Sequence, residues 1–310
     1  MDWSAINPAF YVASVMVAAT PLLLAAIGEL VVEKTGVLNL GVEGMMIIGA
    51  VCGFITAVET GSPSLGFVGG ALGGAALSVV FAVLTQFFLT SQVPTGLALT
   101  LFGLGASAMV GQSYVGIVPP KMPQLMSGAE LNAFERIVLG HDAMLYIGLA
   151  IPVAVWAVLR FSRLGLILRA VGEDHNAAHA LGYKVMWIRF GAIVFGGACA
   201  GFGGAYLSLV RVPQWTEGMT TGAGWIALAL VVFASWRPLL IILGAYIFGG
   251  IAILQLNLQA AGSTIPVEYL SMSPYVITIF VLVLLSALHK YGISRAQAPA
   301  MLGRSFHASN

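Results

Sequence analysis

Long, unbroken apolar runs dominate the chain, separated by short polar or glycine-containing segments. The runs lack a strict alternation of apolar and polar positions, so they predict helices rather than the strands of a barrel. A membrane-spanning helix needs about 20 apolar residues, which predicts an all-α polytopic membrane protein with about nine transmembrane helices. The expected spans are residues 10–31, 40–57, 65–89, 94–115, 143–160, 187–209, 222–236, 239–258 and 272–289.

The composition agrees with a membrane protein. Of 310 residues, 59% are hydrophobic and 8% are charged, whereas about 25% of the residues of a soluble protein are charged. The net charge of +1 provides no basic surface, so we expect no nucleic-acid partner. Cys52 and Cys199 lie inside apolar runs, which predicts small buried residues rather than a disulfide or a metal pair.

The distribution of lysine and arginine predicts the orientation. With the N-terminus outside, ten of the 13 basic residues fall on the cytoplasmic side, and only Lys121, Arg136 and Arg211 fall outside. The positive-inside rule therefore favours an N-out, C-in arrangement. At Arg237-Pro238, both a turn between two spans and a kink in a shallow hairpin remain open.

Two polar regions flank the predicted spans. The outer loop at residues 116–142 is long enough to hold a short surface helix. The tail at residues 291–310 is polar and rich in small residues, which predicts a flexible cytoplasmic segment.

Residues 169–182, which we call the polar island, lie between two predicted spans. Charged residues gather in and around it, so we expect it to face a partner. His175 and His179 have the i, i+4 spacing of a zinc site, and an intramembrane zinc protease is the alternative. The glutamate that would act as general base in such a protease is replaced here by Asn176.

The boundary between the first two spans, residues 33–44, is half apolar and half helix-breaking. Such segments are typical of the interrupted helices of transporters, which place polar helix ends inside the membrane. We expect Asn39 to cap the next helix and Glu43 to lie in its first turn. The alternative is that Glu43 caps a helix near the cytoplasmic surface.

Two glycine patterns have different meanings. Residues 28–35 have nearly the spacing of a phosphate-binding loop, but Glu33 replaces the second glycine and the context is a membrane helix. We therefore expect no nucleotide site in this chain. The four-residue spacing of glycines in residues 69–74 and 197–201 predicts faces for close helix packing.

Three segments together resemble one family of membrane proteins. They are the polar island, residues 33–44, and residues 222–238, which end in Trp236-Arg237-Pro238. In this order they resemble the inner-membrane permeases of ABC importers, in the branched-chain amino acid, ribose and nucleoside family. The nucleoside branch, which works with basic membrane lipoproteins, is the most similar. Its members usually have a glycine before the Trp-x-Pro end, where this chain has Ala234-Ser235.

The resemblance implies a permease domain in residues 1–290 with a coupling loop at residues 161–186. In this loop a short cytoplasmic helix would transmit motion from an ATPase. We expect Gly172 and Gly182 to terminate the helix, and acidic residues to suit its N-terminus. The expected coupling residues are Arg169, Gly172, Glu173, Asp174, Ala177, Ala178 and Gly182.

The resemblance also implies the partners and the location. They are a second permease subunit, usually a different chain, two ATP-binding cassette subunits that bind ATP and Mg²⁺, and an external solute-binding protein. We expect this chain to bind no cofactor of its own and to be a transport subunit rather than an enzyme. The implied location is the bacterial inner (plasma) membrane, as a multi-pass protein.

Polar residues inside a span are costly, at roughly 2.5–3.5 kcal/mol for a charge at the bilayer centre, so they are candidates for the solute path. Aromatic residues are candidates for stacking on a base or sugar. The resulting set is Asn39, Glu43, Phe54, Gln86, Trp225 and Asn257. For Gln86 and Asn257, a position near a span end beside lipid headgroups is the alternative. A nucleoside is the expected solute; a simple sugar, a riboflavin-like solute or a branched-chain amino acid is the alternative.

Overall fold

The long apolar runs form helices in the computed structural model, which describes residues 8–126, 132–260 and 298–307 and isolated positions between 266 and 287. Within these residues, seven helices are long and apolar enough to cross a membrane. The elements are α1 (Pro8–Lys34), α2 (Val42–Thr60), α3 (Pro63–Ala82), the π-helix η2 (Val83–Phe87), α4 (Gln92–Gly111), the 3-10 helix η3 (Gln112–Tyr114), α5 (Ala133–Leu139), α6 (Ala143–Phe161), α7 (Arg163–Glu173), α8 (His175–Ala180), α9 (Val185–Tyr206), the π-helix η4 (Leu207–Arg211), α10 (Ala223–Phe233) and α11 (Pro238–Ala260).

Seven of the expected spans correspond to these long helices, and two do not. The prediction of a full span at residues 222–236 is wrong, because α10 has 11 residues and is about 16 Å long at 1.5 Å per residue. It is half as long as the roughly 30 Å hydrocarbon core. Most of the expected span at residues 272–289 lies outside the described residues, although the positions described there are helical.

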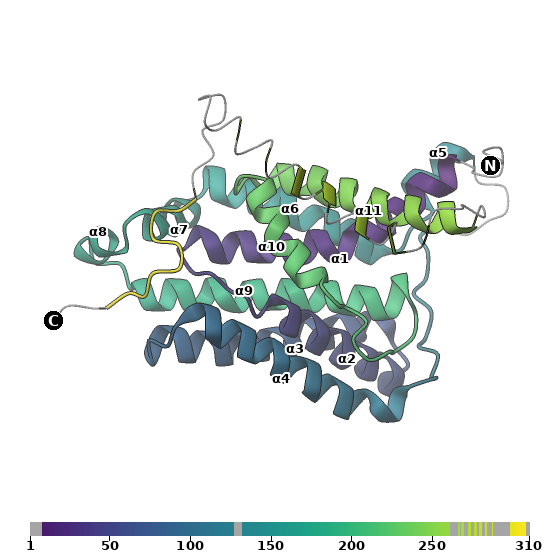
Figure 1. Cartoon of the computed structure of the whole chain (residues 1–310), viewed down its shortest axis with the longest axis horizontal. Helices are drawn as coiled ribbons and strands as arrows, with labels where there is room; N and C mark the ends of the chain where they lie inside the picture. Colours follow the sequence, from purple (N-terminus) through teal and green to yellow (C-terminus); the bar gives the residue numbers. More distant parts are fainter. Residues whose placement is uncertain are drawn as a thin grey trace.

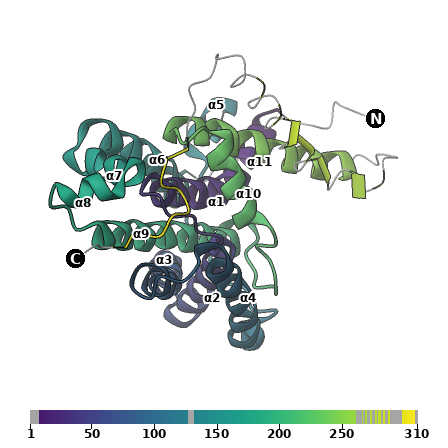
Figure 2. The same cartoon turned by 60° about the vertical axis from the view of Figure 1, so that its left-hand side comes forward.

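Helix α9 lies at the centre of the bundle, between α1 on one side and α2 and α3 on the other (Figures 1 and 2). The contact between α3 and α9 depends on glycine. A Cβ atom built on Gly201 would lie 2.2 Å from the carbonyl oxygen of Gly70 and 2.9 Å from the Cα of Gly74. The predicted glycine faces are therefore confirmed, and they bring the two backbones into direct contact.

The loops differ in how well they match expectation. The loop at residues 116–142 holds the expected short helix, α5, which begins with a capping box between Asn132 and Glu135. The expected flexible tail at residues 291–310 lies partly outside the described residues and stays a prediction; we call its described part, residues 298–307, the C-terminal strap. The strap packs against the bundle, and its Phe306 is buried in an apolar cluster with Val171, Ala178 and Val185. It is drawn in yellow at the α8 end of Figure 1.

Substituting glycine by alanine at two positions of α9 tests the close packing. Gly201→Ala places a methyl group against backbone atoms, which cannot move aside by a side-chain rotation. We therefore expect the free energy of unfolding to fall by about 1–3 kcal/mol. Gly191→Ala is the matched control, because nothing lies within 4 Å of its added Cβ. It should be neutral or stabilise the helix by about 0.5–1 kcal/mol. Thermal unfolding in detergent measures both variants, and equal midpoints would contradict the glycine interface.

Candidate functional site

The polar island forms two short helices with a sharp break between them. Helix α7 ends at Glu173, and Asp174 is extended, with φ −150° and ψ 97°. The Asp174 carboxylate accepts hydrogen bonds from the backbone N–H groups of Asn176 and Ala177, at 2.9 and 3.0 Å. The expected acidic N-terminus of the island's helix is thus confirmed, because Asp174 is the N-cap of α8.

The two glycines expected to terminate the island's helix have different positions in the structure. Gly182 lies just beyond the helix with φ +89°, and the Gly182 N–H donates to the carbonyl of His179, as in a glycine C-cap. The expectation that Gly172 terminates the helix is wrong, because Gly172 lies inside α7. It is a close-approach site instead: an added Cβ would be 2.2 Å from the Lys34 carbonyl oxygen at the end of α1.

The adjacent alanines Ala177 and Ala178 of α8 differ in burial. Ala178 is buried with Val171, Val185 and Phe306, whereas Ala177 is exposed. Arg169, Glu173 and Asp174 are exposed as well. At the end of α8, Leu181 is an apolar side chain with 77% of its surface exposed. The outer surface of α8 is therefore an accessible apolar and acidic patch.

The C-terminal strap holds α8 from one side. The Phe306 ring contacts the rings of His175 and His179, with centroid distances of 5.2 and 5.3 Å. The Met301 N–H donates to the carbonyl of Gly172 at 2.9 Å, so the strap also fixes α7. The histidine pair thus packs on a phenylalanine, and within the described residues no third His, Cys, Asp or Glu joins it in a metal-binding group.

Arg189, in the first turns of α9, connects three separate segments. Its fully buried guanidinium donates from Nε to the Thr35 carbonyl at 3.0 Å and from Nη1 to the Arg304 carbonyl at 3.0 Å. Its Nη2 lies 3.1 Å from Nδ1 of His175. Burial, and then the charge of Arg189, lower the pKa of His175. The contact therefore favours a neutral imidazole and weakens as the pH falls below the ordinary pKa of about 6.5.

Thr35 begins the segment that we call the elbow, Thr35–Gly41, between α1 and α2. The Asn39 N–H donates to Oε1 of Glu29 at 3.1 Å, which places the elbow beside α1, five residues before that helix ends. The Asn39 side chain accepts from the Gly41 N–H at 2.9 Å. Asn39 thus orders the turn before α2, whereas Gly41 is the N-cap residue. The elbow is a buried interruption inside the bundle, as the sequence predicts.

Glu43, in the first turn of α2, caps a different helix. Its carboxylate accepts from the Thr220 hydroxyl at 2.6 Å and from the Gly224 N–H at 2.7 Å. Because α10 begins at Ala223, the carboxylate lies at the positive end of the α10 dipole. Glu43 therefore fixes the start of this half-length helix inside the bundle, and the backbone N–H groups there have a partner.

The far end of α10 is fixed by a second glutamate. The Trp236 indole N–H donates to the carboxylate of Glu33 near the end of α1. The family that the chain resembles usually has a glycine just before this tryptophan. Ser235 and Trp236 both have positive φ, 51° and 54°. Such a conformation costs an L-residue about 1–2 kcal/mol, and the buried Trp236 contact offsets that cost.

The expected solute-path residues do not form one site. Trp225 lies beside Glu43 at the start of α10 and has 49% of its surface exposed. Phe54 is enclosed in the core, and the buried Gln86 amide donates to Thr85 in η2. Asn257 is half-buried near the end of α11. The structure brings together Asn39, Glu43 and Trp225 around the elbow and leaves the other three apart.

Sequence reasoning missed Arg189, Thr220 and Phe306 as connecting residues. For Arg189 a signal existed, because a charged residue inside an expected span indicates a buried interaction. Thr220 and Phe306 carry no such signal, since a threonine in a loop and one aromatic ring in a polar tail are common.

Three relatives and one family are similar to this chain in sequence. The chain is 40% identical to a putative glucose ABC transporter permease protein of Haloferax volcanii, over 91% of each chain. It is 31% identical to a guanosine ABC transporter permease protein of Bacillus subtilis, over 87% of this chain and 90% of the relative. It is 30% identical to a nucleoside ABC transporter permease protein of Lactococcus lactis, over 88% and 91%. Residues 11–284 match the family described as branched-chain amino acid transport system, permease component, and the chain belongs to that family.

Proposed function

We propose that this ABC transporter permease subunit forms half of the path of an importer and moves a nucleoside inward. As a multi-pass inner-membrane protein of this family, it works with a partner permease and ATPases. We further propose that the partner permease is a different chain and that an external binding protein delivers the solute. In this proposal ATP and Mg²⁺ bind to the ATPase subunits.

The coupling role rests on the geometry of α8. A helix that transmits force must be accessible on one face and rigidly attached on the other. Leu181 and Glu173 are exposed, while Ala178 is buried and His175 is in contact with Arg189. This observation carries the proposal that the outer face of α8 seats in the ATPase.

The solute class rests on the relatives and on the chemistry beside Glu43. Two relatives carry names for guanosine or nucleoside transport. The half-exposed Trp225 ring lies next to the polar start of α10, an arrangement that suits stacking on a base and hydrogen bonding to a ribose. Glucose is the second candidate, because the relative with 40% identity is named for glucose.

The substitution Leu181→Asp tests the coupling surface. It places a charge in the proposed apolar contact but leaves α8 folded, since Leu181 is mostly exposed. We expect solute uptake to fall by about tenfold or more, which corresponds to about 1.4 kcal/mol of lost contact. ATP hydrolysis and uptake by the reconstituted transporter are the measurements. Leu181→Met is the control and should behave as wild type; wild-type uptake by Leu181→Asp would exclude this surface. Gly182→Trp is a poorer test, because the positive φ of Gly182 strains any side chain.

Transport in proteoliposomes, with the cognate binding protein present, separates the two solute candidates. We expect ATP-dependent uptake of radiolabelled guanosine or uridine and no uptake of glucose. Trp225→Ala should lower nucleoside uptake by roughly fivefold or more, given about 1–3 kcal/mol per stacked base, while Trp225→Phe retains most of it. Uptake of glucose alone would replace the nucleoside with the second candidate.

A further inference from the structure

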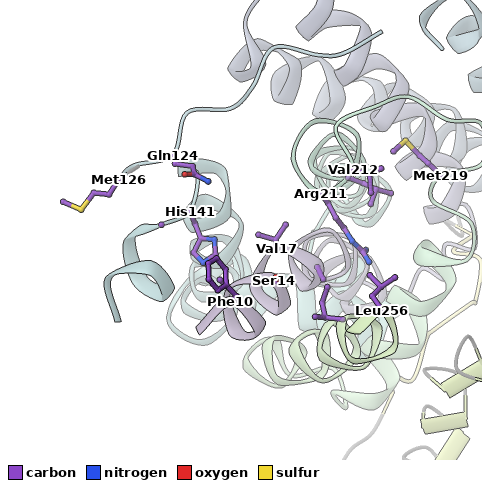
Figure 3. A pocket seen from close by; sticks show the side chains of 15 residues that line it. Phe10, Ser14, Val17, Gln124, Met126, His141, Arg211, Val212, Met219 and Leu256 are labelled. Carbon is purple, nitrogen blue, oxygen red and sulfur yellow. The ribbon is translucent and has the colours of Figure 1, made fainter. Parts of the chain in front are cut away.

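A cavity of about 720 Å³ lies at the end of the bundle opposite α8. Its walls come from the first turns of α1, the loop before α6, the end of η4 and the last turns of α11. Figure 3 shows His141 and Arg211 on different sides of this space. Most of the wall is apolar, including Phe10, Val17 and Leu256. The volume lies in the range of cavities that hold small molecules.

Arg211 supplies a cation to this cavity. It lies at the C-terminal end of η4 and is half-buried. Among the described residues, no hydrogen bond or ion pair joins the Arg211 guanidinium to another group. Asp142, which follows His141, already accepts from the Leu145 N–H and the Tyr206 hydroxyl. A half-buried guanidinium without an acceptor favours the binding of an anionic group.

His141 supplies a second polar atom. The residue is 5% exposed, and its Nε2 has no hydrogen-bond partner within the described part of the chain. Burial lowers the pKa of His141, although the charge of Asp142 and the Ile137 carbonyl oppose this shift. Burial thus favours the neutral ring. Nε2 therefore has a hydrogen-bonding capacity that no described residue uses.

We propose that this cavity binds an anion that also carries a hydroxyl group, such as a glycerol phosphate, either free or as the headgroup of a lipid. The phosphate pairs with Arg211, and the hydroxyl forms a hydrogen bond with Nε2 of His141. The apolar walls at Phe10 and Leu256 accommodate an attached hydrocarbon chain. The site is separate from α8 and from the Glu43 contacts, so it does not depend on the proposed transport of a nucleoside.

Binding to the full-length chain, purified with its partner subunits, tests the proposal. The probes are dihexanoyl phosphatidylglycerol, sn-glycerol 3-phosphate and dihexanoyl phosphatidylcholine, the last of which has no free hydroxyl and no net charge. Calorimetry should show saturable binding of one or both glycerol phosphates and at least tenfold weaker binding of phosphatidylcholine. Tighter binding of phosphatidylglycerol identifies a lipid source, whereas equal binding of glycerol 3-phosphate identifies a free solute.

Three variants test the roles of the two polar residues and of the cavity. Arg211→Gln should weaken binding by about tenfold or more, as expected for a lost charged hydrogen bond. His141→Phe should lower the preference for hydroxyl-bearing probes, and Ala13→Trp should block the cavity without removing either polar group. Arg163→Gln, an exposed arginine of α7, is the control and should bind as wild type does. No binding of any probe, or equal binding of phosphatidylglycerol and phosphatidylcholine in the wild type and Arg211→Gln, would overturn the proposal.

Discussion

The buried guanidinium of Arg189 is the constraint on which the architecture of the α8 end of the bundle depends. A buried charge is tolerated only where hydrogen-bond acceptors surround it. The acceptors come from the elbow, the C-terminal strap and α8, through Thr35, Arg304 and His175. These three segments are far apart in the sequence, so the need to satisfy one side chain holds them together at the start of α9.

From this point a continuous set of contacts leads into the bundle. The elbow continues from Thr35 to Asn39, which is held by Glu29, and then to Glu43 in α2. Glu43 fixes the start of α10, and Trp236 fixes its end to Glu33 of α1. A displacement of α8 would therefore reach a half-length helix whose first residues include the exposed Trp225. This gives a physical route from the proposed ATPase contact to the proposed solute path, through packed and hydrogen-bonded segments.

The sequence predicts the long helices well, because about 20 apolar residues have one common solution in a membrane. It overestimates the length of α10, because residues 222–236 have the hydropathy of a span. The contact of Glu43 that limits the start of α10 joins residues about 180 positions apart, so no local pattern reveals it. The local pattern of the polar island predicts acidic residues at the start of its helix and Gly182 at its end. It does not reveal that Gly172 touches α1 or that Phe306 packs on His175, because both depend on tertiary contacts.

The most direct test of this account is the amount of solute transported per ATP hydrolysed by the reconstituted transporter carrying Arg189→Gln, compared with Arg163→Gln on the exposed face of α7. If Arg189 connects α8 to the elbow, the Arg189 variant hydrolyses ATP but its transport per ATP falls by about tenfold or more, a change of roughly 1.4 kcal/mol in coupling. The Arg163 variant retains the wild-type ratio. A wild-type ratio in a folded and assembled Arg189→Gln transporter would contradict the account.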